Sequence, residues 1–369
     1  MHLNENPLSV LLISPDPEVY GGVSGFIELL KARMSCKAAS FFVGRIHTKK
    51  ENTFIIMKRL LGAPFTLAKQ VRSQHFDVVH INPSFNCKSL VRDGLLLFAL
   101  RMIGFRRVLV YFHSWHPALE ARISTIPGFR QLLGWVLNGT GYIMVLAPAF
   151  KQYLESAGVQ ADRILITRTM FDGDSIQSGN EDAQHPRRRS ILFMSRFVRE
   201  KGIYELLHAF ARIATEFPDV DLIMAGDGRE SAPLQEQAEA LNLRNRITFP
   251  GYVGGEAKFA LLRNCTIFAL PTYFPEGMPV ALLEAMGAGK PLLTAQAGGI
   301  QHIISTPDNG IILDNVNSET VETGLRTLLD DPEYCRKTGQ HNAVYAWQHF
   351  EAKAVTAEIE QLYRKIACH

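Results

Sequence analysis

Short apolar runs alternate with longer amphipathic runs along almost the whole chain. Runs such as SVLLIS and RVLVYFH are apolar without interruption, which is typical of parallel strands covered on both faces. The strands predicted in the first half are Val10–Ser14, Ser40–Val43, Asp77–Ile81, Arg107–His113, Tyr142–Leu146 and Ile164–Thr167, and the helices lie near Val23–Met34, Lys58–Ser73, Ser89–Ile103, Gly128–Leu137 and Ala149–Ala157. This alternation predicts a doubly wound α/β domain.

A polar segment, residues 172–189, interrupts the alternation and ends in three arginines. We predict that it links two domains, residues 1–171 and 190–349. Beyond it the predicted strands are Ser190–Met194, Val220–Ala225, Arg246–Phe249, Thr266–Leu270, Pro291–Thr294 and Gly310–Leu313, and the helices lie near Gly202–Phe217, Ala232–Leu241, Gly255–Leu262 and Val280–Gly287, with helix from Val316 onward and Phe350–Ile366 as a separate amphipathic segment. Two such domains predict a cleft where the carboxyl ends of both sheets face each other, and ligands bind at such ends.

Composition agrees with two globular domains, since 47% of the 369 residues are apolar and 20% are charged. The formal net charge of +3 is too small to indicate nucleic-acid binding. The five cysteines form no C-x-x-C pair and no His or Cys cluster has ligand spacing, so we expect a reducing, cytoplasmic compartment and no metal site. We also expect no secretory signal. Residues 132–150 are uncharged over the length of a membrane span, but Asn138-Gly139 predicts a helix end there, followed by a buried strand.

The run from Pro271 to Gly299, PTYFPEGMPVALLEAMGAGKPLLTAQAGG, contains the most informative pair of polar residues. Glu276 precedes a helix start marked by Gly277 and Pro279, and Glu284 lies inside that helix. Unpaired N–H groups at a helix start favour anions and hydroxyl groups, so the two carboxylates suit a ligand with two polyols separated by a diphosphate. Taken alone, the spacing also fits an ordinary capped helix with solvated acids, which is the commoner case.

Three more clusters follow predicted strands. Gly21 and Gly22 would let backbone N–H groups approach a phosphate at a helix start, or would form a plain turn. His113 could orient a substrate near neutral pH, or be an ordinary loop histidine. Arg196 and Lys201 flank a loop that opens a helix, and two cations there suit a diphosphate leaving group, with solvated surface charge as the alternative.

Taken together, the motifs S-R-F-x3-K-G, A-G-D-G, the Pro271–Gly299 run and the early G-G-V loop resemble those of the retaining GT-B glycosyltransferases, specifically glycosyltransferase family 4. The resemblance covers nearly the whole chain and is strongest from Ile191 to Gly310. It implies the GT-B fold, two doubly wound Rossmann-like domains facing across a cleft. The first domain would bind the acceptor and the second the donor, and the C-terminal helix of residues 350–369 would pack back on the first.

The resemblance implies a nucleotide-sugar donor as co-substrate and neither a cofactor nor a metal. The residues that would bind this donor are Gly21, Gly22, Arg196, Lys201, Tyr252, Val253, Glu276, Gly277, Met278, Pro279 and Glu284. The residues that would take part in catalysis are His113, Arg196, Lys201 and Glu276.

The roles follow from the same resemblance. Arg196 and Lys201 would hold the diphosphate, whose oxygens the glycine loop at 21–22 would also contact. Glu284 would accept the ribose hydroxyls, and Glu276 would bind hydroxyls of the donor sugar. His113 would face the donor sugar and the acceptor. Residues 252–253 would border the base.

The chain departs from the family at two places. Ser195 stands where the family often has glycine before the diphosphate arginine, and Gln301-His302 stand where it commonly has Pro-Glu. These departures affect the prediction of which donor is bound more than the prediction of which reaction is catalysed.

The segments Lys58–Arg72 and Arg101–Arg107 are basic and amphipathic. Such segments lie on anionic membrane surfaces, or cover their own core with a solvated basic face. We expect a peripheral enzyme at the inner face of the cell membrane, with a lipid-linked or growing glycan acceptor in polysaccharide or O-antigen assembly. The rival interpretations are a nucleotide-sugar epimerase of the same architecture and a non-catalytic binder of sugar nucleotides.

Overall fold

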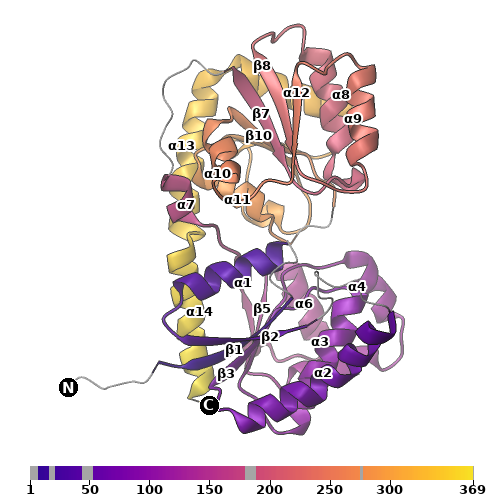
Figure 1. Ribbon diagram of the computed structural model, residues 1–369, viewed down its shortest axis with the longest axis vertical. Coiled ribbons are helices and arrows are strands. Elements are labelled where there is room, and N and C mark those ends of the chain that lie inside the picture. The colour runs from indigo at the N-terminus through magenta and orange to yellow at the C-terminus, as the bar shows by residue number, and fades with distance from the viewer. Residues whose placement is uncertain (1–6, 16–20, 44–52, 179–187, 275–276, 369) are drawn as a thin grey trace, which may run out of the picture. The chain divides into compact units, whose positions relative to one another are not determined.

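The computed structural model describes residues 7–15, 21–43, 53–178, 188–274 and 277–368, with only the backbone described for residues 53–57 and 117. The chain divides into an N-terminal unit, Met1–Thr169 with Ala352–His369, and a C-terminal unit, Met170–Glu351. Each unit is an α/β structure built on one parallel sheet of six strands (Figure 1). The predicted fold class is therefore confirmed. No helix in the described part of the chain is both long enough and apolar enough to cross a membrane.

The sheet of the N-terminal unit has the strand order β2-β1-β3-β4-β5-β6. Its strands are β1 (Ser9–Ser14), β2 (Lys37–Phe42), β3 (Val78–Ile81), β4 (Val108–Tyr111), β5 (Tyr142–Val145) and β6 (Ile164–Ile166). Its helices are α1 (Gly22–Arg33), α2 (Thr53–Ser73), α3 (Cys87–Met102), α4 (Pro117–Ser124), α5 (Phe129–Leu137), α6 (Pro148–Ser156), the 3-10 turn η1 (Ala161–Arg163) and α14 (Ala352–Ala367).

Two elements of this unit differ from the prediction. Strand β2 begins at Lys37 rather than Ser40, because it is an edge strand whose first residues are exposed and carry no continuous apolar signal. Helix α4 was not predicted, since its eight residues give too short a run to show a helical period.

Helix α14 packs against α1, β3 and β4 of the N-terminal unit, although it is the last helix of the chain. The Glu360 carboxylate accepts hydrogen bonds from the backbone N–H of Ser35 at 2.6 Å and of Cys36 at 3.0 Å. The Tyr363 hydroxyl lies 2.6 Å from Nδ1 of His80, and both side chains are fully buried. These contacts explain why the final helix belongs to the first unit.

The sheet of the C-terminal unit has the order β12-β11-β10-β7-β8-β9. Its strands are β7 (Arg189–Met194), β8 (Val220–Ala225), β9 (Ile247–Gly251), β10 (Ile267–Leu270), β11 (Leu292–Ala295) and β12 (Gly310–Leu313). Its helices are α7 (Gly173–Gln177), α8 (Ile203–Ile213), α9 (Ser231–Ala240), α10 (Gly255–Asn264), α11 (Val280–Gly287), α12 (Ser318–Asp330) and α13 (Pro332–His349), with 3-10 turns η2 (Arg199–Lys201) and η3 (Ile300–His302).

Part of the predicted linker is helical. Helix α7 begins after Asp172, whose side chain accepts a hydrogen bond from the Ser175 N–H. Ile176 is buried, and α7 packs on α10 and α11 of the C-terminal unit. Helix α7 was not predicted, because one buried apolar side chain in a polar segment gives no periodicity. Residues 179–187 lie outside the described residues.

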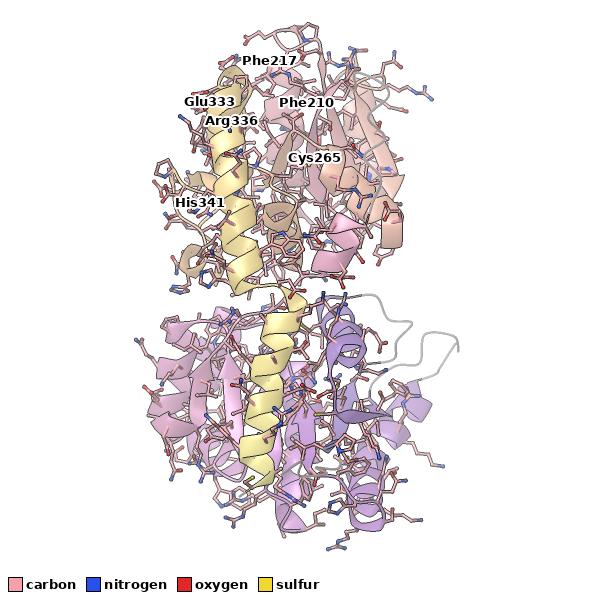
Figure 2. The ribbon with its side chains drawn as sticks, turned by 90° about the vertical axis from the view of Figure 1, so that its left-hand side faces the viewer. Phe210, Phe217, Cys265, Glu333, Arg336 and His341 are labelled. Carbon is pink, nitrogen blue, oxygen red and sulfur yellow. The ribbon has the colours of Figure 1, made fainter. Side chains whose placement is uncertain are left out.

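Helices α12 and α13 meet at Asp331, which ends the first and caps the second by accepting a hydrogen bond from the Tyr334 N–H at 2.8 Å. Figure 2 shows Glu333, Arg336 and His341 along α13. Arg336 and Glu333 form an ion pair at 2.7 Å on its exposed surface.

Candidate functional site

The loops that follow β7, β8 and β9 meet at one edge of the C-terminal sheet. The Gly226 N–H donates to the Gly251 carbonyl at 2.8 Å, and the Ser195 N–H donates to the Ala225 carbonyl at 3.2 Å. A Cβ atom at Gly226 would lie 1.9 Å from the Ser195 carbonyl oxygen. Glycine in the A-G-D-G motif is therefore required by the close approach of two backbone segments.

The loop after β7 is also fixed against the loop after β10. The N–H groups of Tyr273 and Phe274 both donate to the Glu200 carbonyl at 2.9 Å. Gly202 has a φ of 73°, and a Cβ atom there would lie 2.1 Å from the Pro271 carbonyl oxygen. The S-R-F-x3-K-G motif is thus held by backbone contacts, which places the start of α8 beside the Pro271–Phe274 segment.

The two cations of this loop differ in their surroundings. Lys201 is buried with 5% exposure, and its Nζ lies 5.0 Å from the centre of the Phe274 ring. Arg196 is exposed, with its guanidinium carbon 5.9 Å from the same ring. The alternative of two solvated surface cations is therefore wrong for Lys201. A cation away from water attracts an anion more strongly than a solvated one, because the local dielectric is lower.

Helix α11 begins at Val280, as predicted, and contains Glu284. The Glu284 side chain is buried, and its Oε1 lies 2.5 Å from Nζ of Lys258 on α10. Burial raises the pKa of the Glu284 carboxyl, while the Lys258 ammonium opposes that shift. Sequence analysis missed Lys258, and no signal identifies it, because a half-exposed lysine on a helix is ordinary.

The loop before α11 is closely packed where it is described. Met278 is buried, and Pro279 precedes the helix in an extended conformation. A Cβ atom at Gly299 would lie 1.8 Å from the Gly277 carbonyl oxygen, so the G-G turn after β11 touches this loop. Glu276 lies outside the described residues.

Tyr252 and Val253 follow β9 at the same edge of the sheet. Tyr252 is 60% exposed, and Val253 is partly exposed. The predicted residues of the C-terminal unit that the structure describes thus all lie in segments that follow the carboxyl ends of β7, β9 and β10.

The other predicted residues lie at the carboxyl ends of strands in the N-terminal unit. Gly21 and Gly22 form the start of α1 after β1, and both are exposed. A Cβ atom at either glycine would meet no described atom within 4 Å, and the φ of 175° at Gly21 suits any residue. Among the described residues, neither a close contact nor a left-handed φ accounts for glycine at these two positions.

His113 follows β4 and pairs with Asn82, which follows the adjacent strand β3. Nε2 of His113 lies 2.8 Å from Oδ1 of Asn82. The Asn82 amide nitrogen donates to the carbonyls of Ile13 at 3.3 Å and His80 at 3.5 Å, which orients its oxygen toward His113. An amide oxygen only accepts, so Nε2 carries the proton and Nδ1 is left as an acceptor.

Aromatic rings surround this histidine. Tyr111 and Phe26 have ring centres 4.0 and 4.7 Å from that of His113. Burial lowers the pKa of His113 to about 3, with a smaller contribution from His80, whose own pKa burial lowers to about 3. Both imidazoles are therefore neutral near pH 7. Sequence analysis placed His113 at a strand end but did not identify Asn82, although it too follows an apolar strand.

Comparison with known families found a match within the C-terminal unit. Residues 179–343, most of the C-terminal unit, match the family described as Glycosyl transferases group 1. This segment is therefore related to the group 1 glycosyl transferases. The resemblance found in its motifs is confirmed.

Individual relatives are distant. The chain is 25% identical to the N-acetyl-alpha-D-glucosaminyl L-malate synthase of Bacillus anthracis over 53% of its own length, a match that spans about half of that relative (50%). It is 28% identical to the uncharacterized glycosyltransferase YqgM of Bacillus subtilis over 83% of each chain.

Solved structures show the same fold. The crystal structure of Anabaena HepE in complex with UDP and glucose matches with a TM-score of 0.73 at 17% identity, over 97% of this chain and 100% of that one. The prediction of the GT-B fold for this chain is confirmed by that likeness.

Proposed function

We propose that this protein is a retaining glycosyltransferase that moves a sugar from a nucleoside-diphosphate donor to a hydroxyl acceptor. The observation that carries the proposal is the loop after β7, where the buried Lys201 and the exposed Arg196 stand before the start of α8. Such a pair suits a diphosphate, whose negative charge increases as its bond to the sugar breaks. The fold likeness to HepE, solved with UDP and glucose, supports the choice of donor class.

The proposed reaction exchanges one bond of the anomeric carbon for another. The acceptor hydroxyl attacks on the face from which the diphosphate departs, so the configuration at that carbon is retained. The bond to the phosphate oxygen breaks, the bond to the acceptor oxygen forms, and the hydroxyl proton passes to the departing phosphate. Lys201, Arg196 and the backbone N–H groups at Gly21 and Gly22 would stabilise the nucleoside diphosphate, without a metal ion.

The polar pairs of the site suggest two further roles. Glu284 would accept hydrogen bonds from the ribose hydroxyls, and the adjacent Lys258 favours its ionised form. His113 would accept a hydrogen bond at Nδ1 from a hydroxyl of the sugar or the acceptor, because Asn82 occupies Nε2. Glu276, which lies outside the described residues, is proposed to bind the donor sugar.

We propose a lipid-linked or growing glycan as the acceptor, in polysaccharide or O-antigen assembly. The support is the basic character of Lys58–Arg72 and Arg101–Arg107 in the N-terminal unit, since basic segments favour anionic, membrane-borne substrates.

The test begins with thermal unfolding in the presence of UDP-, GDP- and ADP-sugars, because a bound donor raises the melting temperature by mass action. The stabilising donor is then incubated with lipid-linked and free glycan acceptors, and nucleoside diphosphate release and anomeric configuration are measured. Conversion of the donor alone to another nucleotide sugar would identify an epimerase. Stabilisation without turnover by any acceptor would identify a non-catalytic binder.

A further inference from the structure

Helix α2 of the N-terminal unit exposes an apolar stripe between cations. Lys58, Leu61, Phe65, Lys69 and Arg72 recur every three or four residues, so they share one face of the helix. All five are exposed, and Phe65 and Leu61 reach 79% and 59%. This face is therefore more than the solvated basic surface that sequence analysis offered as an alternative.

Helix α3 repeats the arrangement. Lys88, Val91, Leu95, Phe98 and Met102 follow the same spacing, and all are exposed, with Val91 at 67% and Met102 at 65%. Other residues of this helix, such as Leu96 and Leu100, are buried in the interior of the unit. The exposed stripe is thus additional to the face that covers the sheet.

These stripes lie on one surface. Helices α2, α3 and α5 follow β2, β3 and β4 in crossovers that run in one direction along the sheet, so right-handed connections put all three on the same side. Helix α3 packs between the other two, and α2 and α3 lie side by side in Figure 1.

Helix α5 extends the surface. Its Trp135 is 43% exposed and lies 6.1 Å from the Phe98 ring, and Leu132 is 53% exposed. We call the surface made of these side chains the apolar face; its members are Leu61, Phe65, Val91, Leu95, Phe98, Met102, Leu132 and Trp135.

The segment that carries the apolar face is strongly basic. Residues 53–137 contain eleven Lys and Arg but three Asp and Glu, a surplus of eight in a chain whose net charge is +3. The three carboxylates all have partners inside the unit: Asp93 pairs with Arg92, Asp77 accepts from the Ser9 N–H, and Glu120 accepts from the Trp115 indole. The guanidinium of Arg101 lies 4.0 Å from the Trp135 ring.

We propose that the apolar face docks on the surface of a bilayer that contains anionic lipid. Aromatic and aliphatic side chains enter the boundary between headgroups and acyl chains, while the surrounding lysines and arginines contact lipid phosphates. A second copy of the chain is a poorer occupant, since a symmetric contact would bring like charges together. Docking itself does not depend on the proposed transferase function. The reason for docking rests on that function, because a lipid-linked acceptor would lie in such a surface.

Flotation with vesicles tests docking without donor or acceptor. We expect the full-length protein to float with phosphatidylcholine vesicles that contain phosphatidylglycerol and to stay behind with phosphatidylcholine alone. The double variant Phe65→Ser/Phe98→Ser should lower the partition coefficient at least tenfold. Lys69→Glu and Arg72→Glu should each lower it about fivefold or more, since one cation near the surface contributes about that factor.

Matched variants on the C-terminal unit control for a general change in surface. Leu241→Ser/Val344→Ser removes two exposed apolar side chains, and Arg244→Glu reverses one exposed cation. Both should bind vesicles as the wild type does. In addition, Trp135 fluorescence should shift to the blue on anionic vesicles, and Trp135→Phe should abolish that shift.

Several results would overturn docking. These are no flotation with anionic vesicles, equal losses in the control variants, or a dimer in light scattering that Phe65→Ser/Phe98→Ser dissociates. An acidic protein partner that binds this surface while vesicles do not would have the same consequence. Donor-induced thermal stabilisation should be unchanged in every surface variant, so a failure of docking and a failure of the proposed transferase function are distinguishable.

Discussion

The two units of this protein differ most in the side chains that they expose. Exposed large apolar side chains in the described residues are concentrated in the N-terminal unit: Phe42, Leu61, Phe65, Val91, Leu95, Phe98, Met102, Ile126, Leu132, Trp135, Leu165 and Ile166, against Leu241, Tyr252, Tyr273 and Val344 in the C-terminal unit. The C-terminal unit instead carries many paired charges, such as Glu333 with Arg336 on α13 (Figure 2). The surface of the C-terminal unit is therefore typical of one that faces water. The surface of the N-terminal unit has the composition of an interface.

The candidate site residues of the two units are also held in place by different kinds of contact. In the C-terminal unit, backbone contacts at Gly202, Gly226 and Gly299 fix the loops, so the residue types are dictated by close approach. In the N-terminal unit, side chains such as Asn82 and His113 fix one another, while the glycine turn at 21–22 stays open. The loops of the C-terminal unit are therefore the more closely constrained by backbone contacts.

The largest effect is expected at Lys201. Lys201→Ala should lower the transfer rate by about 10²–10³, because one preorganised contact to the leaving group is lost. Lys337→Ala, which removes an exposed lysine from α13, should leave the rate unchanged. Initial rates of nucleoside diphosphate release measure both. Full transfer activity in Lys201→Ala would contradict the assigned role of the loop after β7.

Glycine substitutions separate the two kinds of loop. Gly226→Ala should destabilise the C-terminal unit by about 1–3 kcal/mol, because the new methyl group has no room beside the Ser195 carbonyl. Gly22→Ala should leave the melting temperature unchanged, since a methyl group there meets no described atom. It should nevertheless weaken donor-induced stabilisation, if phosphate approaches this turn. Equal melting temperatures for the two variants would show that the close approach at Gly226 is not limiting.

Sequence patterns predicted the strands and helices well where periodicity was strong. Strand β7 lies within a residue of its predicted bounds, and α11 matches them, because buried parallel strands and a marked helix start give clear signals. The edge strand β2 and the short helix α7 were misjudged, since exposure and short length remove periodicity.

The same contrast applies to the site. The motif cations and glycines of the C-terminal unit were found because ligand chemistry and backbone contact both constrain them. Lys258, Asn82 and the part of the apolar face formed by Val91, Leu95, Phe98, Leu132 and Trp135 were not found. Each depends on which side chains meet across elements, as when Lys258 on α10 reaches Glu284 on α11. Spacing within one helix cannot reveal such a meeting, and an exposed leucine or phenylalanine resembles a core residue in sequence.

Acid should destabilise the N-terminal unit first. Burial lowers the pKa of His80 and His113 to about 3, whereas an unfolded histidine has a pKa of about 6.5. Between these pH values the unfolded chain binds more protons than the folded one. The contribution of the two neutral histidines to the free energy of unfolding is therefore fully present above pH 6.5. It falls as the pH decreases toward 3, by up to about 1.4 kcal/mol per pH unit for each histidine. Hydrogen exchange at pH 7 and pH 5 should show selective loss of protection in the N-terminal unit. His80→Phe should reduce this pH dependence, and uniform loss in both units would contradict it.

The smallest effect is expected at Asn82, which acts only through His113. Asn82→Ala removes the acceptor at Nε2, so the imidazole should become a mixture of two tautomers. We expect kcat to fall up to about tenfold, the worth of one neutral hydrogen bond, with less change in the donor KM. Nitrogen-15 NMR of the histidine ring reports the tautomer directly, independently of activity.

Asn82→Asp and Asn86→Ala distinguish positioning from packing. Aspartate accepts from the same Nε2–H, so the tautomer should be kept, while its charge should raise the pKa of His113 and shift the pH profile of kcat. Asn86 caps α3 by accepting from the Ser89 N–H at 3.0 Å, so its removal should cost about 1 kcal/mol of stability without changing the His113 tautomer. If Asn82→Ala kept a single Nε2–H tautomer, or Asn86→Ala lowered kcat equally, His113 would not depend on Asn82. The acceptor role assigned to Nδ1 would then lose its basis, whereas the assignment of Lys201 would stand, because it depends on no contact with this pair.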